Sequence, residues 1–128
     1  LGLTPQTVHA LGGYRVQGRS DADADKLIAD ALALEAAGAQ MLVLEMVPAE
    51  LAARLTKLLT TCITIGIGAG SEVDGQVLVI NDMLGYTQEF NPRFLRRYMN
   101  AGDQIHDAVT RYVSDVKSGE VPNEKEQY

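Results

Sequence analysis

The sequence predicts an α/β fold with a parallel sheet, and within that class the second half of a (β/α)8 barrel. Short apolar segments of strand length alternate with amphipathic segments of helix length along the 128 residues. The strand segments are apolar at consecutive positions, which is typical of strands that helices cover. Three strands are clear and a fourth is expected to end at residues 1–3. Because four is half of eight, we expect the chain to be half of one barrel domain and to begin inside a longer polypeptide.

The first part of the chain carries a loop, a helix, a strand and a second helix. Residues 1–19 are rich in glycine and contain Pro5, so we expect a long loop on the active-site side, with a short helix near residues 5–11. Ser20 is the predicted N-cap of a helix that Gly38 ends. A strand over residues 41–44 follows, and Pro48 is predicted at the first position of the next helix.

The second part begins with two more strands. Residues 63–67 form the first, which runs into a glycine-rich exit. Asp74 and Gly75 predict a turn before a strand over residues 76–80 that ends at Asn81 and Asp82. A long amphipathic helix is expected over residues 93–116, with Gly102 as a point of interruption, and residues 118–128 form a polar tail.

Composition excludes several classes of partner. The net charge of −6 argues against nucleic acid, since phosphate contacts need clustered Lys and Arg. No apolar run approaches the roughly 18 residues of a membrane span. The single cysteine, Cys62, cannot form an internal disulfide, which fits a reducing compartment. We therefore expect a cytoplasmic protein with neither nucleic-acid nor membrane partners.

Glu45 is the principal candidate for chemistry. It follows an apolar strand directly, and in (β/α) barrels the reacting groups lie at the carboxyl ends of the strands. The alternative is a structural glutamate that pairs with Arg15 or Arg19 at the rim of the sheet. The residue pattern alone leaves both interpretations open.

The other candidates have weaker patterns. Gly66, Gly68 and Gly70 either cradle a phosphate or, as we favour, form a tight strand exit where a substrate approaches the backbone. Asp82, with Asn81, lies at a predicted strand end and either serves the site or braces the loop. Three further residues lack metal-ligand spacing and are interpreted as surface or core residues: His9, His106 and Cys62. A basic group on the predicted last helix is interpreted as a solvated or subunit-facing surface: Arg93, Arg96 and Arg97.

Five motifs, in order and with plausible spacing, resemble the ketopantoate hydroxymethyltransferase family. They are Leu1-Gly-Leu-Thr-Pro-Gln6, Gly13-Tyr-Arg-Val-Gln-Gly-Arg19, Val43-Leu-Glu-Met-Val-Pro-Ala-Glu50, Thr64-Ile-Gly-Ile-Gly-Ala-Gly70 and Asp74-Gly-Gln-Val-Leu78. The likeness covers essentially the whole chain and corresponds to the C-terminal half of the family. The chain departs from the family at Asn81, where histidine is common, and in its last five residues.

The resemblance implies a barrel of the phosphoenolpyruvate/pyruvate type and a role in pantothenate and coenzyme A biosynthesis. It implies that Glu45 is the catalytic base and that 5,10-methylenetetrahydrofolate gives a one-carbon unit to 3-methyl-2-oxobutanoate. It also implies a homo-oligomer, a decamer in the family, and a Mg²⁺ ion whose ligands lie upstream of Leu1, so that no metal ligand is expected in this chain. Two alternatives remain: a Mg²⁺-dependent carbon–carbon lyase of the same superfamily, and a non-catalytic chain that completes a barrel.

Overall fold

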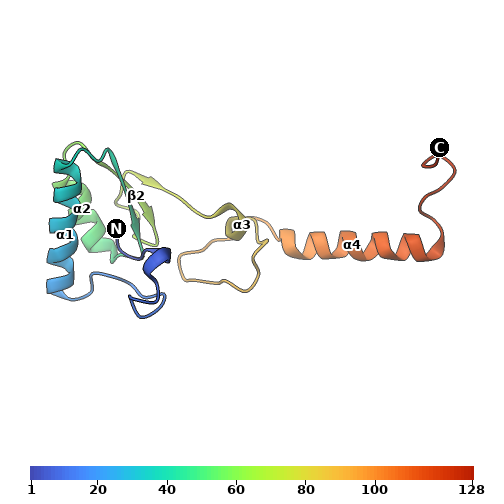
Figure 1. The fold of residues 1–128 in the computed structure, drawn as a ribbon, viewed down its shortest axis with the longest axis horizontal. Coiled ribbons are helices and arrows are strands. Elements are labelled where there is room, and N and C mark those ends of the chain that lie inside the picture. The colour runs from blue at the N-terminus through green and yellow to red at the C-terminus, as the bar shows by residue number, and fades with distance from the viewer. The chain divides into compact units, whose positions relative to one another are not determined.

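The chain consists of two compact units. The computed structural model describes all residues, Leu1–Tyr128, and the units are Leu1–Leu78 and Val79–Tyr128 (Figure 1). None of the helices is both long enough and apolar enough to cross a membrane.

The first unit is built on a parallel sheet of three strands in the order β1 (Met41–Glu45), β2 (Ile63–Ile67) and β3 (Gly75–Gln76). Strands β1 and β2 pair along their full length, and β3 continues the parallel arrangement beside β2. Gly2 forms a parallel bridge with Glu45 on the other side of β1. The predicted parallel order of the three strands is confirmed. The fourth strand expected to end at residues 1–3 is represented only by the Gly2 bridge.

The third strand is shorter than predicted. Residues 76–80 were expected to form it, but β3 ends at Gln76 and residues 80–83 form the short helix α3 (Ile80–Met83). The physical reason is the length of its neighbour. After the bond from Val77 N to Gly66 O, β2 ends at Ile67 and turns away through Gly68, whose φ is +64°. The chain beyond Val77 has no strand left to pair with, so Asn81 and Asp82 lie in α3 and not at a strand end.

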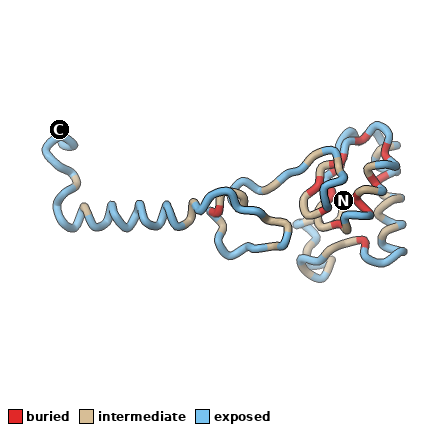
Figure 2. Tube along the Cα trace, turned by 180° about the vertical axis from the view of Figure 1, so that it is seen from behind, coloured by how far each residue is buried: buried red, intermediate tan, exposed pale blue.

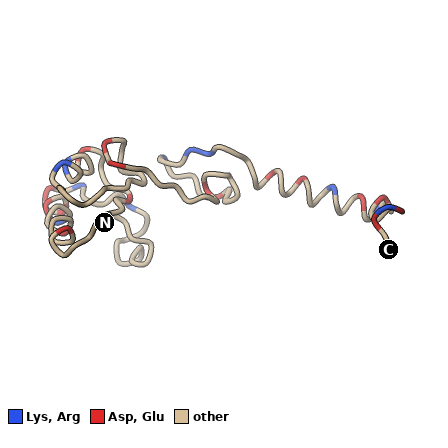
Figure 3. The backbone as a smooth tube through the Cα atoms, turned by 90° about the horizontal axis from the view of Figure 1, so that it is seen from above, with Lys and Arg blue, Asp and Glu red and all other residues tan.

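Helices α1 (Asp21–Ala36) and α2 (Ala49–Leu58) pack against each other and cover one face of the sheet (Figure 1). Helix α1 begins as predicted, since Ser20 Oγ accepts a hydrogen bond from Asp23 N at 3.1 Å. Acidic residues are concentrated along this helix (Figure 3), including Asp21 and Asp23 in its first turn, where the helix dipole favours them. Pro48 precedes α2 as its N-cap, one position earlier than predicted. The buried side chains under the two helices form the core: Ala31, Leu42, Leu44, Val47, Leu51, Ala52, Leu55, Leu59, Cys62 and Ala69.

Glu35, near the end of α1, fastens this helix to the start of β2. Its Oε1 accepts hydrogen bonds from the backbone N–H groups of Thr60, Thr61 and Cys62 at 2.8, 2.7 and 2.9 Å. These bonds favour the ionised carboxylate, so the pKa of Glu35 lies below its ordinary value. Sequence reasoning did not identify this residue, because its partners follow 25 to 27 positions later.

The opposite face of the sheet is open within the first unit. Its side chains come from alternate positions of β1 and β2, and Met41, Val43 and Ile63 are 56, 44 and 48% exposed. The strands are thus apolar on both faces but covered on only one face within this unit, as expected of half a barrel. Helices α1 and α2 both cover the face that carries Leu42 and Leu44, and no third layer follows in the first unit.

The second unit consists of α3, an irregular segment and α4 (Ala101–Ser118). The helix was predicted from residue 93, but residues 93–100 are not helical and Gly102 lies in the first turn instead of interrupting it. Helix α4 starts at Ala101 because Leu84 O and Gly85 O accept the N–H groups of Ala101 and Gly102 at 2.9 and 3.0 Å. Figure 2 shows that buried positions gather in the first unit, whereas α4 is exposed along most of its length.

The remaining segments have little regular structure. Residues 1–19 form the expected loop, with the short 3-10 helix η1 (Pro5–Thr7) where a short helix was predicted. Residues 119–128 form the expected non-helical polar tail after Gly119, whose φ of +81° ends α4.

Candidate functional site

Glu45 is the last residue of β1, and its backbone is held by the segment at residues 1–3. Glu45 N donates to Leu1 O at 3.0 Å, and Glu45 O accepts from Leu3 N at 2.8 Å. The pairing of β1 with β2 sets Glu45 opposite Ile67, and the alternation of the strand places it on the open face with Val43. The structure therefore puts a half-buried carboxylate beside apolar side chains at the carboxyl edge of the sheet.

Burial raises the pKa of Glu45 above its ordinary value. No side-chain ion pair compensates the carboxylate. The ion pairs of the chain join Lys26 to Asp30, Lys57 to Glu72 and His106 to Asp107, and none joins Glu45 to Arg15 or Arg19. The structural alternative for Glu45, a salt bridge at the rim, is therefore not present. A carboxylate in this state is suited to accept a proton.

Met46 adopts a left-handed backbone conformation directly after Glu45, with φ +49°. Its N–H donates to Ile67 O at 2.9 Å, and its carbonyl accepts from Gln17 N at 2.9 Å. The loop of residues 1–19 is thus attached to the carboxyl edge of the sheet at the residue after the candidate base.

The glycine-rich exit of β2 is packed by residues of the chain itself. A Cβ atom at Gly66 would lie 2.9 Å from Val73 Cγ2, and one at Gly70 would lie 2.5 Å from Ala49 Cβ. Gln76 Nε2 donates to Gly70 O at 2.8 Å and braces the same exit. Internal packing therefore explains glycine at positions 66 and 70. The expectation that Gly66, Gly68 and Gly70 contact a ligand stays a prediction.

A buried polar network that the sequence did not reveal joins β2 to the start of β3. Thr64 is fully buried, and its N–H and hydroxyl donate to Asp74 Oδ2 at 2.8 and 2.9 Å. These bonds hold the pKa of Asp74 below its ordinary value. Thr64 Oγ1 also lies 2.8 Å from Thr56 Oγ1 on α2. The available signal was a threonine inside an otherwise apolar strand, since such a residue needs a polar partner.

The other candidates are not on these strand ends. Asp82 is in α3 of the second unit, and its carboxylate makes no hydrogen bond or ion pair, so its site role stays a prediction. His9 is exposed, and Cys62 is buried as expected. Arg93, Arg96 and Arg97 lie before α4 and not on it as predicted. Arg97 Nη2 donates to the carbonyl groups of Thr87 and Gln88 at 2.9 and 2.8 Å.

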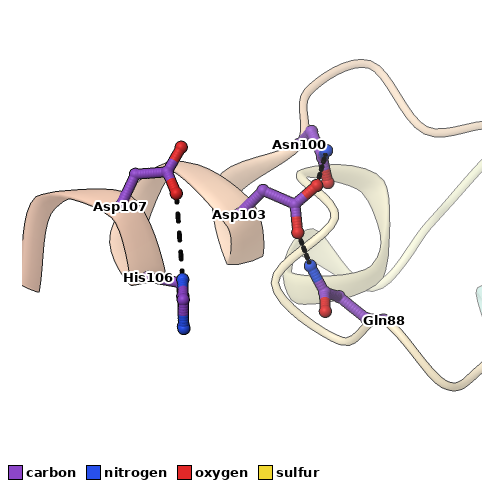
Figure 4. A network of polar contacts seen from close by, with 5 residues as sticks. All are labelled: Gln88, Asn100, Asp103, His106 and Asp107. Carbon is purple, nitrogen blue, oxygen red and sulfur yellow. Dashed lines mark hydrogen bonds and ion pairs between the residues drawn. The ribbon is translucent and has the colours of Figure 1, made fainter. Parts of the chain in front are cut away.

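A polar network at the start of α4 organises the second unit. Gln88 Nε2 donates to Asp103 Oδ1 at 2.7 Å, and Asn100 donates to the other oxygen of Asp103 (Figure 4). These bonds lower the pKa of Asp103. His106 and Asp107 form a separate exposed pair at 3.8 Å. The network fixes the beginning of α4 and offers no convergent set of catalytic groups.

The chain contains no group of three or more His, Cys, Asp or Glu side chains that could hold a metal ion. A Mg²⁺ ion needs several oxygen ligands in near-octahedral geometry. The residues described here therefore do not fit a Mg²⁺ site on their own.

Comparison with known proteins gives one consistent result. The family model described as ketopantoate hydroxymethyltransferase matches residues 1–124. Proteins named 3-methyl-2-oxobutanoate hydroxymethyltransferase from Parabacteroides distasonis and Chlorobium phaeobacteroides are 59 and 55% identical over all 128 residues, which cover 46% of each relative. A protein of the same name from Saccharophagus degradans is 55% identical, with 47% of its length covered. The chain thus spans about half the length of the curated relatives it matches.

Each of the five motifs lies within the matched residues, including the strand that ends in Glu45. The chain belongs to the ketopantoate hydroxymethyltransferase family.

Proposed function

We propose that residues 1–128 form the C-terminal half of a (β/α)8 barrel that transfers a hydroxymethyl group from 5,10-methylenetetrahydrofolate to 3-methyl-2-oxobutanoate, giving 2-dehydropantoate. The observation that carries the proposal is the carboxylate of Glu45, which has a raised pKa and no ion-pair partner and stands at the carboxyl end of β1. Membership in the family supports the keto acid and the transferred group, because the relatives are named for both, whereas the folate donor is implied by the resemblance alone.

In the proposed reaction, Glu45 accepts the proton from C3 of the keto acid. The enolate carbon then forms a bond with the methylene carbon of the folate, whose carbon–nitrogen bonds break as the ring nitrogens regain protons. Water supplies the hydroxyl oxygen, so that keto acid, methylenetetrahydrofolate and water become 2-dehydropantoate and tetrahydrofolate. The apolar neighbours of Glu45 favour proton uptake by the carboxylate because they raise its pKa.

The rest of the machinery is proposed to lie outside this chain. The N-terminal half of the barrel would cover the open face of the sheet and carry the ligands of Mg²⁺, since residues 1–128 hold no suitable cluster. We further propose a cytoplasmic homo-oligomer acting in pantothenate and coenzyme A biosynthesis, as the family resemblance implies. None of the relatives described above is named as a lyase, so the lyase alternative gains no support.

The test compares Glu45→Gln with Glu50→Gln in a complete enzyme, made by joining residues 1–128 to the N-terminal portion of one of these relatives. Gln keeps the size of the side chain but cannot accept the proton. General-base catalysis contributes about 10²–10⁴-fold, so kcat of Glu45→Gln should fall within that range. Glu50 is an exposed carboxylate in the first turn of α2 and serves as the matched control, with parental kcat expected.

The decisive readout is exchange of the C3 proton of the keto acid with D₂O in the absence of folate, followed by NMR. This measurement isolates deprotonation from transfer. Keto-acid binding should stay nearly unchanged in Glu45→Gln while exchange falls with kcat. Exchange at the parental rate would show that Glu45 braces the strand and that the base lies elsewhere. Turnover that needs no folate would point to the lyase.

A further inference from the structure

The strand that carries Glu45 ends in an unusual backbone conformation. Met46 is the only non-glycine residue of the chain with a positive φ. Side chains other than those of Gly, Asn and Asp rarely adopt this conformation, because Cβ approaches the following carbonyl oxygen. Strained residues of this kind persist where the surroundings fix them, and they cluster at functional sites.

The surroundings of Met46 do fix its conformation. The N–H and carbonyl groups of Glu45 and Met46 are all bonded, to Leu1, Leu3, Ile67 and Gln17, at 2.8 to 3.0 Å. Residues from three separate segments therefore determine the path of the backbone at this point.

The left-handed turn changes the face on which the next side chain lies. Continued alternation from Val43 and Glu45 would place Val47 on the open face. Instead Val47 is only 2% exposed and belongs to the core with Leu51 and Ala52 of α2. The turn at Met46 thus sends Val47 into the core and leaves Glu45 as the last side chain of β1 on the open face.

We propose that Met46 is a positioning residue, whose left-handed backbone holds the carboxylate of Glu45 in the direction needed to take the substrate proton. This proposal rests on the proposed function of Glu45. It predicts that residues which adopt a positive φ easily at position 46 allow fast deprotonation, and that residues which resist it slow this step. Substrate binding should change little in either case.

The matched variants are Met46→Asn and Met46→Val in the complete enzyme. Asn adopts the left-handed region readily, whereas the β-branched Val resists it, although the two side chains are of similar size. Small misplacements of a reacting group cost up to about 100-fold in rate, so we expect Val to lower kcat and C3 proton exchange by about 10- to 100-fold. KM should change little, and Asn should retain most of the parental rate.

A second pair of variants covers the case in which Met46→Val does not fold. Ala lacks the β-branch but still disfavours positive φ, so Met46→Ala should have a lower Tm and slower exchange than Met46→Gly. This order of Tm is independent of the reaction. Ala53→Gly on α2 is the control, because glycine in a helix should lower Tm. It shows that glycine stabilises only where φ is positive.

The outcomes separate this proposal from the proposed function. Equal kcat in the Asn and Val variants, or in Ala and Gly, with Glu45→Gln inactive, overturns the role of Met46 alone. A rise in KM that accounts for the loss of kcat/KM also overturns it. Parental exchange in Glu45→Gln overturns the role of Glu45 and leaves Met46 with no base to position.

Discussion

Two carboxylates of the first unit, Glu35 on α1 and Glu45 on β1, have pKa values shifted in opposite directions. Glu35 receives three backbone N–H bonds and its pKa falls, whereas Glu45 is desolvated among apolar neighbours and its pKa rises. The sequence indicated Glu45 because a charge at the end of an apolar strand is conspicuous. It did not indicate Glu35 or Asp74. Their hydrogen-bond partners lie 10 to 27 positions away in the sequence and come close to them only in the folded chain.

The raised pKa of Glu45 predicts the pH at which activity is lost on the acid side of the pH–rate profile. The base must be ionised, so kcat/KM of the complete enzyme should rise with pH through a midpoint above 4.5, the ordinary carboxyl value. Ile67→Thr places a hydroxyl opposite Glu45 on the same face and should move this midpoint to lower pH. The control is Ile63→Thr, at the other end of β2. A midpoint that Ile67→Thr leaves unmoved would assign the profile to another group.

The lowered pKa of Glu35 predicts a pH-dependent contribution to stability. A carboxyl group whose folded-state pKa is depressed stabilises the protein above its unfolded-state pKa, and this contribution is lost as pH falls through the folded-state value. Glu35→Gln should therefore lower Tm at neutral pH, and its difference from the parent should shrink below about pH 4.5. Glu72→Gln, in an exposed ion pair with Lys57, is the control. A pH-independent difference would contradict the assignment.

At the scale of elements, the bounds of a helix or strand could be predicted where neighbouring residues set them. They could not be predicted where residues far along the chain set them. The start of α1 was predicted because Ser20 and its partner Asp23 are three residues apart. The start of α4 was predicted too early. It depends on hydrogen bonds to the carbonyl groups of Leu84 and Gly85, and the spacing of apolar residues gives no sign of these bonds. The parallel order of β1, β2 and β3 followed from alternating elements, but the length of β3 is set by where β2 ends.

The network between β2 and β3 predicts how the short third strand is held. Asp74→Asn keeps the shape of the side chain but weakens its acceptance of the two bonds from Thr64. We expect a lower Tm and faster hydrogen exchange at Val77 N, which bonds to Gly66 O. Asp30→Asn, which affects only an exposed pair with Lys26, is the control. Unchanged exchange at Val77 would show that β3 is held by other contacts.

For the whole molecule, the open sheet face predicts the behaviour of the chain in isolation. Met41, Val43 and Ile63 present apolar surface, and β3 leaves one edge of the sheet unpaired. The purified 128-residue chain should be inactive and should aggregate with increasing concentration, as measured by light scattering. Addition of an N-terminal half from a relative should reduce scattering and restore turnover. Full turnover by the chain alone would contradict the half-barrel proposal.

The opposite shifts of Glu35 and Glu45 have a consequence for an acidifying environment. As pH falls, Glu45 takes up its proton first, while the carboxylates of Glu35 and Asp74 remain ionised and keep their backbone partners. Over that interval the proposed complete enzyme would lose its base, although the bonds that Glu35 and Asp74 accept stay in place. Mild acid should therefore act as a reversible off-state, from which neutralisation restores activity without refolding.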